Sequence, residues 1–161
     1  MFNFFKPFRV SSTELTDSTM FDEKTFFQKF INDLQGAKEE VIIESPFITS
    51  RRAQMFYPVF KRLLDKGVEV YVITRPPHDQ ENEVLKEQAE RTIAHFERLG
   101  VQALLSSGNH HRKLAILDKM ILWEGSLNIL SQSNSREFMR RIEGRQTAQQ
   151  TYDFLKFGNI L

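Results

Sequence analysis

The sequence predicts a single α/β sandwich domain, in which helices cover both faces of a mixed central β-sheet. Two observations lead to this fold class. Apolar strand-like runs alternate with helical patterns at intervals of roughly thirty residues, which is typical of parallel strands joined by helices. Two further apolar runs flank Asp118 and Lys119, which predicts neighbouring strands joined by a tight turn. A sheet that contains both kinds of connection is mixed.

The composition is that of one globular domain, residues 1–161, in which residues 1–20 form an N-terminal extension or an edge strand. Hydrophobic residues make up 40% of the chain and charged residues 27%. Lysine and arginine number 22 against 21 aspartates and glutamates, so any surface that attracts a polyanion must be local. Cysteine is absent, which excludes disulfides and thiolate metal sites and suits a cytoplasmic location.

The first half of the chain predicts two strands and two helices. Residues 8–12 are a candidate edge strand within a phenylalanine-rich N-terminus that is expected to cover the core or an interface. Asp22 is expected to cap a helix over residues 23–34. Strands are predicted over residues 40–45 and 68–74. Between them lies an amphipathic helix that Pro58 starts or kinks.

The second half predicts a charged helix over residues 80–99, which Gly100 ends. Strands are expected over residues 101–105, 114–117, 120–123 and 138–142, and a terminal helix over residues 147–157. No run of eighteen apolar residues occurs anywhere in the sequence, so we expect no integral membrane association.

Residues 111–128 contain the side chains that are candidates for a catalytic role. They combine six residue types at fixed spacings, namely His111, Lys113, Asp118, Gly125, Ser126 and Asn128. Side chains alternate along a strand, so the imidazole and the ammonium leave one face about 7 Å apart and can meet one phosphate. A neutral imidazole is a competent nucleophile near pH 7, and an ammonium neutralises the charge of non-bridging oxygens.

The remaining motif residues follow from their positions on the hairpin. Ser126 and Asn128 come after the second strand, where a hydroxyl and an amide can donate to a phosphate as charge builds in the transition state. Asp118 lies at the turn, too far along the strand to reach that phosphate, and is interpreted as structural. Gly125 is likewise interpreted as a structural motif residue. None of these roles requires a metal or another cofactor.

These residues and spacings resemble the signature of the phospholipase D superfamily. The resemblance implies a phospholipase D-like α/β sandwich that breaks phosphodiester bonds through a phosphohistidine. It also implies that Glu137, which matches an acidic position of the family, hydrogen bonds the imidazole and fixes its tautomer. The alternative for Glu137 is a solvated carboxylate beside Arg136.

The motif occurs once, although the mechanism needs two imidazoles, one to attack phosphorus and one to protonate the leaving oxygen. The other three histidines are interpreted as loop or surface residues: His78, His95 and His110. Short members of the superfamily with one motif form homodimers in which two motifs meet. We therefore expect a homodimer with His111 of each chain in one site.

The most plausible substrate is nucleic acid, because the short one-motif plan resembles small dimeric nucleases. Arginines near the motif are candidates to line a phosphate-binding groove, namely Arg51, Arg52, Arg112 and Arg140, together with Arg141 and Arg145. The leading hypothesis is a metal-independent endonuclease that cleaves DNA or RNA, with a possible larger nucleic-acid-processing partner such as a helicase. A phospholipid phosphodiesterase and a non-catalytic nucleic-acid-binding module are the alternatives.

Overall fold

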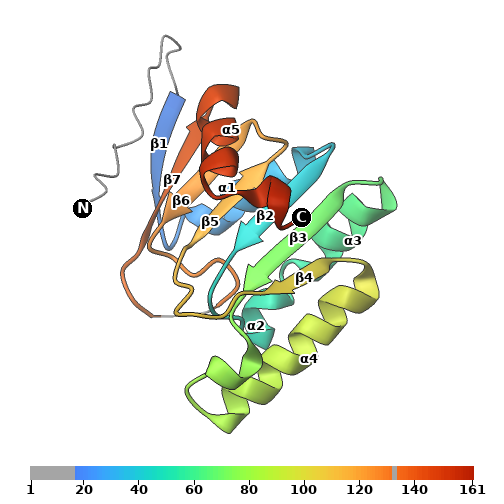
Figure 1. Cartoon of the computed structure of the whole chain (residues 1–161). Coiled ribbons are helices and arrows are strands. Elements are labelled where there is room, and N and C mark those ends of the chain that lie inside the picture. The colour runs from blue at the N-terminus through green and yellow to red at the C-terminus, as the bar shows by residue number, and fades with distance from the viewer. Residues whose placement is uncertain (1–16, 132–133) are drawn as a thin grey trace, which may run out of the picture.

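The computed structural model describes residues 17–131 and 134–161, which form a seven-stranded mixed sheet with helices on both faces (Figure 1). This confirms the predicted α/β sandwich. The strands lie in the order β1-β7-β6-β5-β2-β3-β4. Their bounds are β1 Asp17–Asp22, β2 Glu40–Glu44, β3 Glu69–Thr74, β4 Gln102–Leu105, β5 Leu114–Leu117, β6 Ile121–Gly125 and β7 Phe138–Glu143. Neighbours β2, β3 and β4 run parallel, and the other pairs are antiparallel.

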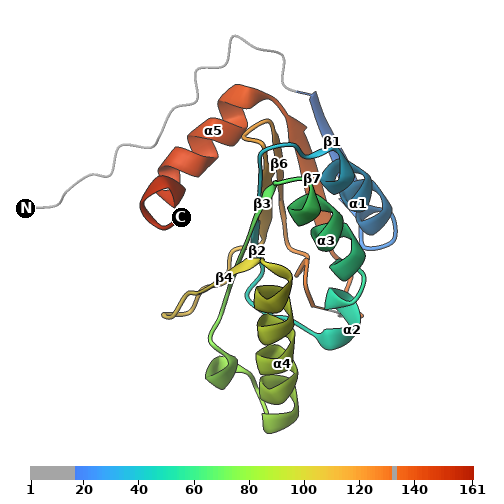
Figure 2. The same ribbon diagram turned by 90° about the vertical axis from the view of Figure 1, so that its right-hand side faces the viewer.

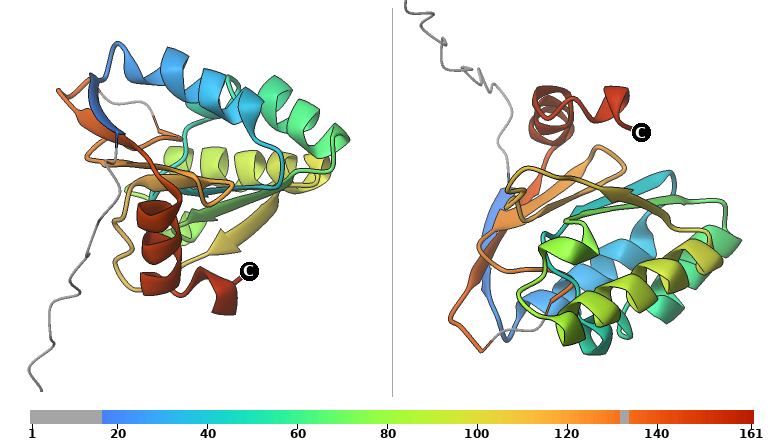
Figure 3. Two further views of the ribbon diagram at one scale, coloured as in Figure 1. Left: turned by 90° about the horizontal axis from the view of Figure 1, so that it is seen from above. Right: turned by 60° about the horizontal axis from the view of Figure 1, so that its bottom comes forward.

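The helices divide unequally between the two faces of the sheet (Figure 2). One face is covered by α1 Phe26–Gly36, α2 Ser50–Ala53, α3 Tyr57–Asp65 and α4 Glu83–Leu99. On the other face α5 Arg145–Phe154 lies alone, followed by the short turn η2 Phe157–Asn159 (Figure 3). The larger part of the core lies under the first group, where Phe26 and Phe30 of α1 pack against Trp123. None of the helices in the described part of the chain has the length and apolarity to span a bilayer.

At the helix starts one local expectation is corrected and one is decided between its two alternatives. Asp22 does not cap α1: its carboxylate accepts hydrogen bonds from the backbone of Lys24 at 3.0 Å and of Thr25 at 2.9 Å, in a turn that precedes the helix. A short polar side chain binds its own downstream backbone more readily than it reaches into the next helical turn. Pro58 lies in the first turn of α3, so it starts that helix and does not kink it. The candidate edge strand at residues 8–12 lies outside the described residues.

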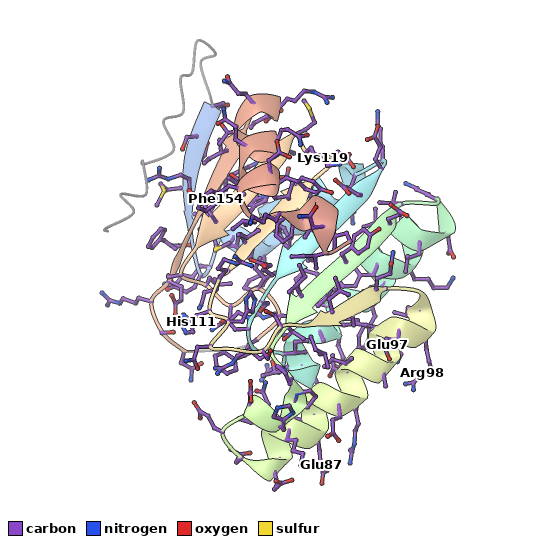
Figure 4. The ribbon with its side chains drawn as sticks, in the orientation of Figure 1. Glu87, Glu97, Arg98, His111, Lys119 and Phe154 are labelled. Atoms are coloured by element: carbon purple, nitrogen blue, oxygen red, sulfur yellow. The ribbon has the colours of Figure 1, made fainter. Side chains whose placement is uncertain are left out.

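The predicted hairpin around Asp118 and Lys119 is present as β5 and β6. Both turn residues have positive φ angles, 53° and 50°, as the tightest hairpin turn requires. The Asp118 carboxylate accepts hydrogen bonds from the backbone N–H groups of Lys38, Glu39 and Glu40. It thus ties the hairpin to the start of β2, at the end of the sheet remote from His111 (Figure 4). This geometry agrees with a structural role for Asp118.

Candidate active site

The motif residues meet where the hairpin opens. His111 and Lys113 lie just before β5, while Ser126 and Asn128 lie just after β6, so antiparallel pairing brings the two segments together. The ladder continues one step beyond the strands, because the Gly125 N–H donates to the Lys113 carbonyl at 3.2 Å. The sequence placed the histidine and the lysine on a regular strand. They occupy an extended approach to β5 instead, yet their side chains still converge.

The side chains of His111 and Lys113 are in direct contact. The Lys113 ammonium lies 3.0 Å from Nδ1 and 3.5 Å from Nε2 of the imidazole, and it donates to the His111 carbonyl at 2.8 Å. An ammonium can only donate, so the ring nitrogen that it contacts must be an acceptor and therefore unprotonated. Partial burial lowers the pKa of Lys113, an effect that the charge of Glu137 opposes. The pair presents a neutral nucleophilic nitrogen beside a cation.

Ser126 and Glu137 are bound to each other. The Ser126 hydroxyl donates to one carboxylate oxygen of Glu137 and accepts from the Phe138 N–H at 3.2 Å. The second carboxylate oxygen accepts from the Ser135 hydroxyl at 2.6 Å. The Ser126 bond, followed by the Ser135 bond, lowers the pKa of Glu137 and keeps it ionised.

This arrangement corrects one expectation, the bond from Glu137 to the imidazole. In the free chain the Ser126 hydroxyl donates its proton to Glu137, so donation from Ser126 to a phosphate stays a prediction. The hydrogen bonds described for the Glu137 carboxylate go to serines, and its link to the His111–Lys113 pair is the electrostatic attraction to Lys113. Glu137 comes from the approach to β7 and Ser126 from the end of β6, two adjacent strands. Short serine hydroxyls at neighbouring strand ends are better placed for this carboxylate than the imidazole is.

Gly125 is required by close strand packing. A Cβ atom at this position would run into the Phe138 carbonyl oxygen and would lie 2.9 Å from the Cα of Met139. Both obstacles belong to the paired strand β7, so a side chain would push β6 and β7 apart. Because Ser126 follows directly, the glycine lets β7 approach closely enough for the Ser126–Glu137 bond to form.

His110 lies in the loop that precedes β5, as the sequence suggested, but it is buried rather than on the surface. It is 7% exposed, and no described residue bonds its Nε2 atom. Burial, together with the positive charges of Arg112, Lys113 and Arg75, lowers its pKa to about 4. Its neighbour His111 is exposed. The two histidines leave the chain on opposite sides, as alternation along an extended segment requires.

The buried His110 predicts a loss of stability in mild acid. The folded state holds this imidazole neutral down to about pH 4, whereas the unfolded chain protonates it near its ordinary value of 6.5. The stabilising contribution is therefore complete above pH 6.5 and disappears as the pH falls to 4, at a cost of about 3 kcal/mol. Urea denaturation across this range should show a shallower pH dependence in His110→Gln than in wild type. Equal slopes in the two proteins would contradict the assignment.

Arg112 lines the same groove as Lys113, but its guanidinium is bound to a buried carboxylate, so its assignment as a substrate-binding residue stays a prediction. Its guanidinium makes two hydrogen bonds of 2.7 Å to the two carboxylate oxygens of Glu44. Glu44 lies at the end of β2 with no exposed surface. Burial raises the pKa of Glu44, and the two bonds from Arg112 oppose that rise. A buried carboxylate needs such a partner, so Arg112 has a structural role, although its side chain is 46% exposed.

The other candidate arginines divide between the groove and the opposite face. Arg140 of β7 lines an open groove of about 540 Å³ together with Lys113, Ser126 and Phe138. Arg52 lies over the Phe27 ring at 3.6 Å and borders a hollow of about 70 Å³ that Glu137 also lines. Burial and the charge of Arg51 lower the pKa of Arg52.

Three further arginines do not line the groove, namely Arg51, Arg141 and Arg145. Arg51 is exposed on α2. Arg141 donates to Asp33 at 2.6 Å and to Glu143 at 2.7 Å, and the indole of Trp123 donates to the same Asp33. It faces the α1 side of the sheet, because the neighbouring residues of a strand point to opposite faces. Arg145 is exposed at the start of α5.

Residues 30–156, which make up most of the chain, match a protein-family model. That family is described as the phospholipase D-like domain of cardiolipin synthase. The chain belongs to this phospholipase D-like family. No curated protein matches the sequence. Among solved structures, it is similar to NucT from Helicobacter pylori, with a TM-score of 0.71 and 18% identity over 88% of this chain and 94% of that one.

Two more solved structures are similar to this chain. Nuc from Salmonella typhimurium, described as a phospholipase D family member, gives a TM-score of 0.71 and 12% identity over 88% of this chain and 93% of that one. Phosphatidylserine synthase from Haemophilus influenzae gives 0.62 and 16%, over 91% of this chain but 38% of that one. At these identities the likeness shows a shared fold.

The structure adds residues to the phospholipase D-like site that sequence reasoning missed. Phe138 and Glu124 line the groove beside Arg140, and the Glu44 carboxylate accepts hydrogen bonds from Arg112. The alternation of β7 offered a signal for Phe138, because residues 138 and 140 share a strand face. Glu44 had no such signal, since its partner lies 68 positions away.

Proposed function

We propose that this protein is a metal-independent endonuclease that cleaves DNA or RNA through a phosphohistidine at His111. The observation that carries the proposal is the contact between an exposed imidazole and the Lys113 ammonium, 3.0 Å apart, beside an open groove that Arg140 also lines. A phosphate in the groove would meet a nucleophile and a cation together. A cytoplasmic location belongs to the same proposal and is supported by the absence of cysteine.

The proposed reaction has two steps. A neutral ring nitrogen of His111 attacks phosphorus and forms a P–N bond while the P–O bond to the leaving group breaks. The leaving oxygen takes a proton from the imidazolium of the partner's His111. Water then attacks the phosphohistidine and gives its proton to that second imidazole, so the P–N bond breaks and both histidines return to their initial states. Lys113 and the Asn128 amide stabilise charge on the non-bridging oxygens.

The second imidazole is proposed to come from a second copy of the chain. His110 is held neutral by a pKa of about 4, which makes it unable to supply a proton near pH 7. His95 belongs to α4, where its ring lies 4.1 Å from that of Tyr57, and His78 lies in the turn η1 Pro77–Asp79. A twofold axis near His111 would bring two motifs together in a homodimer.

The likeness to NucT and Nuc and the charge of the groove support nucleic acid over lipid as substrate. The one-motif chain covers 94% of NucT and 93% of Nuc, whereas it covers 38% of the phosphatidylserine synthase. Arg140 and Lys113 place positive charge along that groove, which is suited to a phosphate backbone.

The test is incubation of the purified protein with single-stranded and duplex DNA and RNA in excess EDTA. We expect cleavage of at least one of these substrates, and a phosphoryl adduct on the peptide that contains His111 by mass spectrometry. Cleavage that EDTA abolishes would overturn the metal-free mechanism. Failure on every nucleic acid would overturn the nuclease assignment.

One observation supports a phospholipid phosphodiesterase as the second candidate. An apolar hollow of about 360 Å³ lies between α5 and the sheet, lined by Phe154, Leu155 and neighbours, and it shares Leu114 and Glu124 with the groove. An acyl chain could lie there beside a phosphate at Lys113. Headgroup release from phosphatidylglycerol vesicles without nicking of plasmid DNA would favour this function. Nucleic-acid binding without any product would favour a non-catalytic module.

A further inference from the structure

A second cavity begins at the motif itself, on the side of Asn128. It has a volume of about 380 Å³ and is separate from the groove that contains Lys113. Its walls come from three segments: the loop after β2, the connection from η1 to α4, and the turn after β6. The lining residues are Phe47, Ile48, Thr49, Gln80, Glu81, Leu85, Asn128 and Ser131. Its size falls in the range of roughly 300–1,000 Å³ of small-molecule pockets.

The walls of this cavity combine an aromatic surface with two amides. Phe47 is half-buried, and the guanidinium carbon of Arg75 lies 5.5 Å from its ring centroid. Gln80, which precedes α4, and Asn128, which follows β6, both line the cavity. Each has a buried amide atom, Nε2 and Oδ1 respectively, that bonds no other described residue. Neither amide is committed to the fold by that atom, so each can turn to pair with a bound group.

This combination matches the chemistry of a nucleobase. A base offers a flat face for stacking on an aromatic ring and an edge that both donates and accepts hydrogen bonds. Side-chain amides also donate and accept, which allows them to pair with such an edge. A phosphate alone would need cations in the cavity wall, and the lining residues include none. An acyl chain would leave both amides without partners.

We propose that the Asn128 cavity receives one unpaired nucleobase next to the phosphate that His111 attacks. The inference rests on the proposed function and narrows its substrate to strands whose bases are free to leave the stack. A base inside a duplex would first have to unpair and turn out, at an energetic cost. Single strands should therefore be cleaved and bound in preference to duplexes of the same sequence.

Binding tests the cavity without requiring turnover. In a His111→Asn background, the dissociation constant is measured for a labelled single-stranded oligonucleotide and for the same strand built from abasic nucleotides. Adding Phe47→Ala or Gln80→Leu should weaken binding of the base-containing strand about ten-fold and leave binding of the abasic strand within two-fold. Phe47→Tyr should retain binding, because it keeps the aromatic face. The matched control is Val84→Ala, since Val84 precedes Leu85 on α4 but is 66% exposed.

Turnover separates this inference from the proposed function. Wild type and the cavity variants are compared in EDTA on single-stranded DNA and on bis(4-nitrophenyl) phosphate, a phosphodiester without a base. The inference predicts a fall in kcat/KM of about ten-fold on DNA alone. Equal losses on both substrates, or equal losses for base-containing and abasic strands in the binding assay, would overturn it. If wild type cleaves neither substrate, the proposed function fails, while the binding assay still decides whether the cavity holds a base.

Discussion

His111→Asn is expected to lower the rate of phosphodiester cleavage at least about 10⁴-fold, because an amide nitrogen cannot form the covalent phosphoryl intermediate. His111 is exposed, and its ring contacts Lys113. Asparagine keeps a polar side chain at this position, so the free energy of unfolding should change by less than about 0.5 kcal/mol. Initial rates in EDTA, beside thermal unfolding followed by circular dichroism, give both quantities. Activity retained in a folded His111→Asn protein would contradict the mechanism.

The same variant tests whether the site is shared between two chains. If each site needs both histidines, a mixed dimer of wild type and His111→Asn has an incomplete site. Equal mixing with full subunit exchange should then remove about half of the wild-type activity, since half of the wild-type chains enter mixed dimers. Mixing with His78→Asn is the control, because His78 lies in η1 and is exposed. Activity that depends only on the amount of wild type would show that each chain carries a complete site.

Arg112→Ala is expected to lower the free energy of unfolding by about 3 kcal/mol. The substitution removes the one residue that donates both hydrogen bonds to a carboxylate with no exposed surface, and breaking one side of a buried ion pair leaves an uncompensated charge. Arg112→Lys should fall between alanine and wild type, because an ammonium keeps the charge but cannot bind both carboxylate oxygens in parallel. Urea denaturation at pH 7 gives the free energy of unfolding of wild type, Arg112→Ala and Arg112→Lys.

The control for this prediction is Arg140→Ala. Arg140 is exposed and lines the groove, so its loss should weaken nucleic-acid binding and change stability by no more than about 0.5 kcal/mol. Arg112→Ala should show the reverse pattern, with a large change in stability. If Arg112→Ala proved as stable as Arg140→Ala and bound DNA more weakly, the guanidinium would be a phosphate contact after all.

Part of the candidate site could be predicted from residues that are close together in the sequence. The spacing of His111, Lys113, Ser126 and Asn128, together with two apolar runs around a tight turn, predicted a hairpin whose open end gathers the motif. Those features depend on residues less than twenty positions apart, and strand alternation and turn chemistry act over that distance. The alternation of strands and helices along the chain predicted the mixed sheet for the same reason.

The sequence by itself therefore determined the fold class, the hairpin and the convergence of His111 and Lys113. Only the tertiary structure decided what each neighbouring side chain does. The pairing of β2 with β5 puts Glu44 opposite Leu114 and so within reach of Arg112, and the approach of β7 to β6 gives the Ser126 proton to Glu137. Such partners come from segments far apart in the chain. Burial and sheet register, which no local periodicity encodes, choose among the possible partners of each charge.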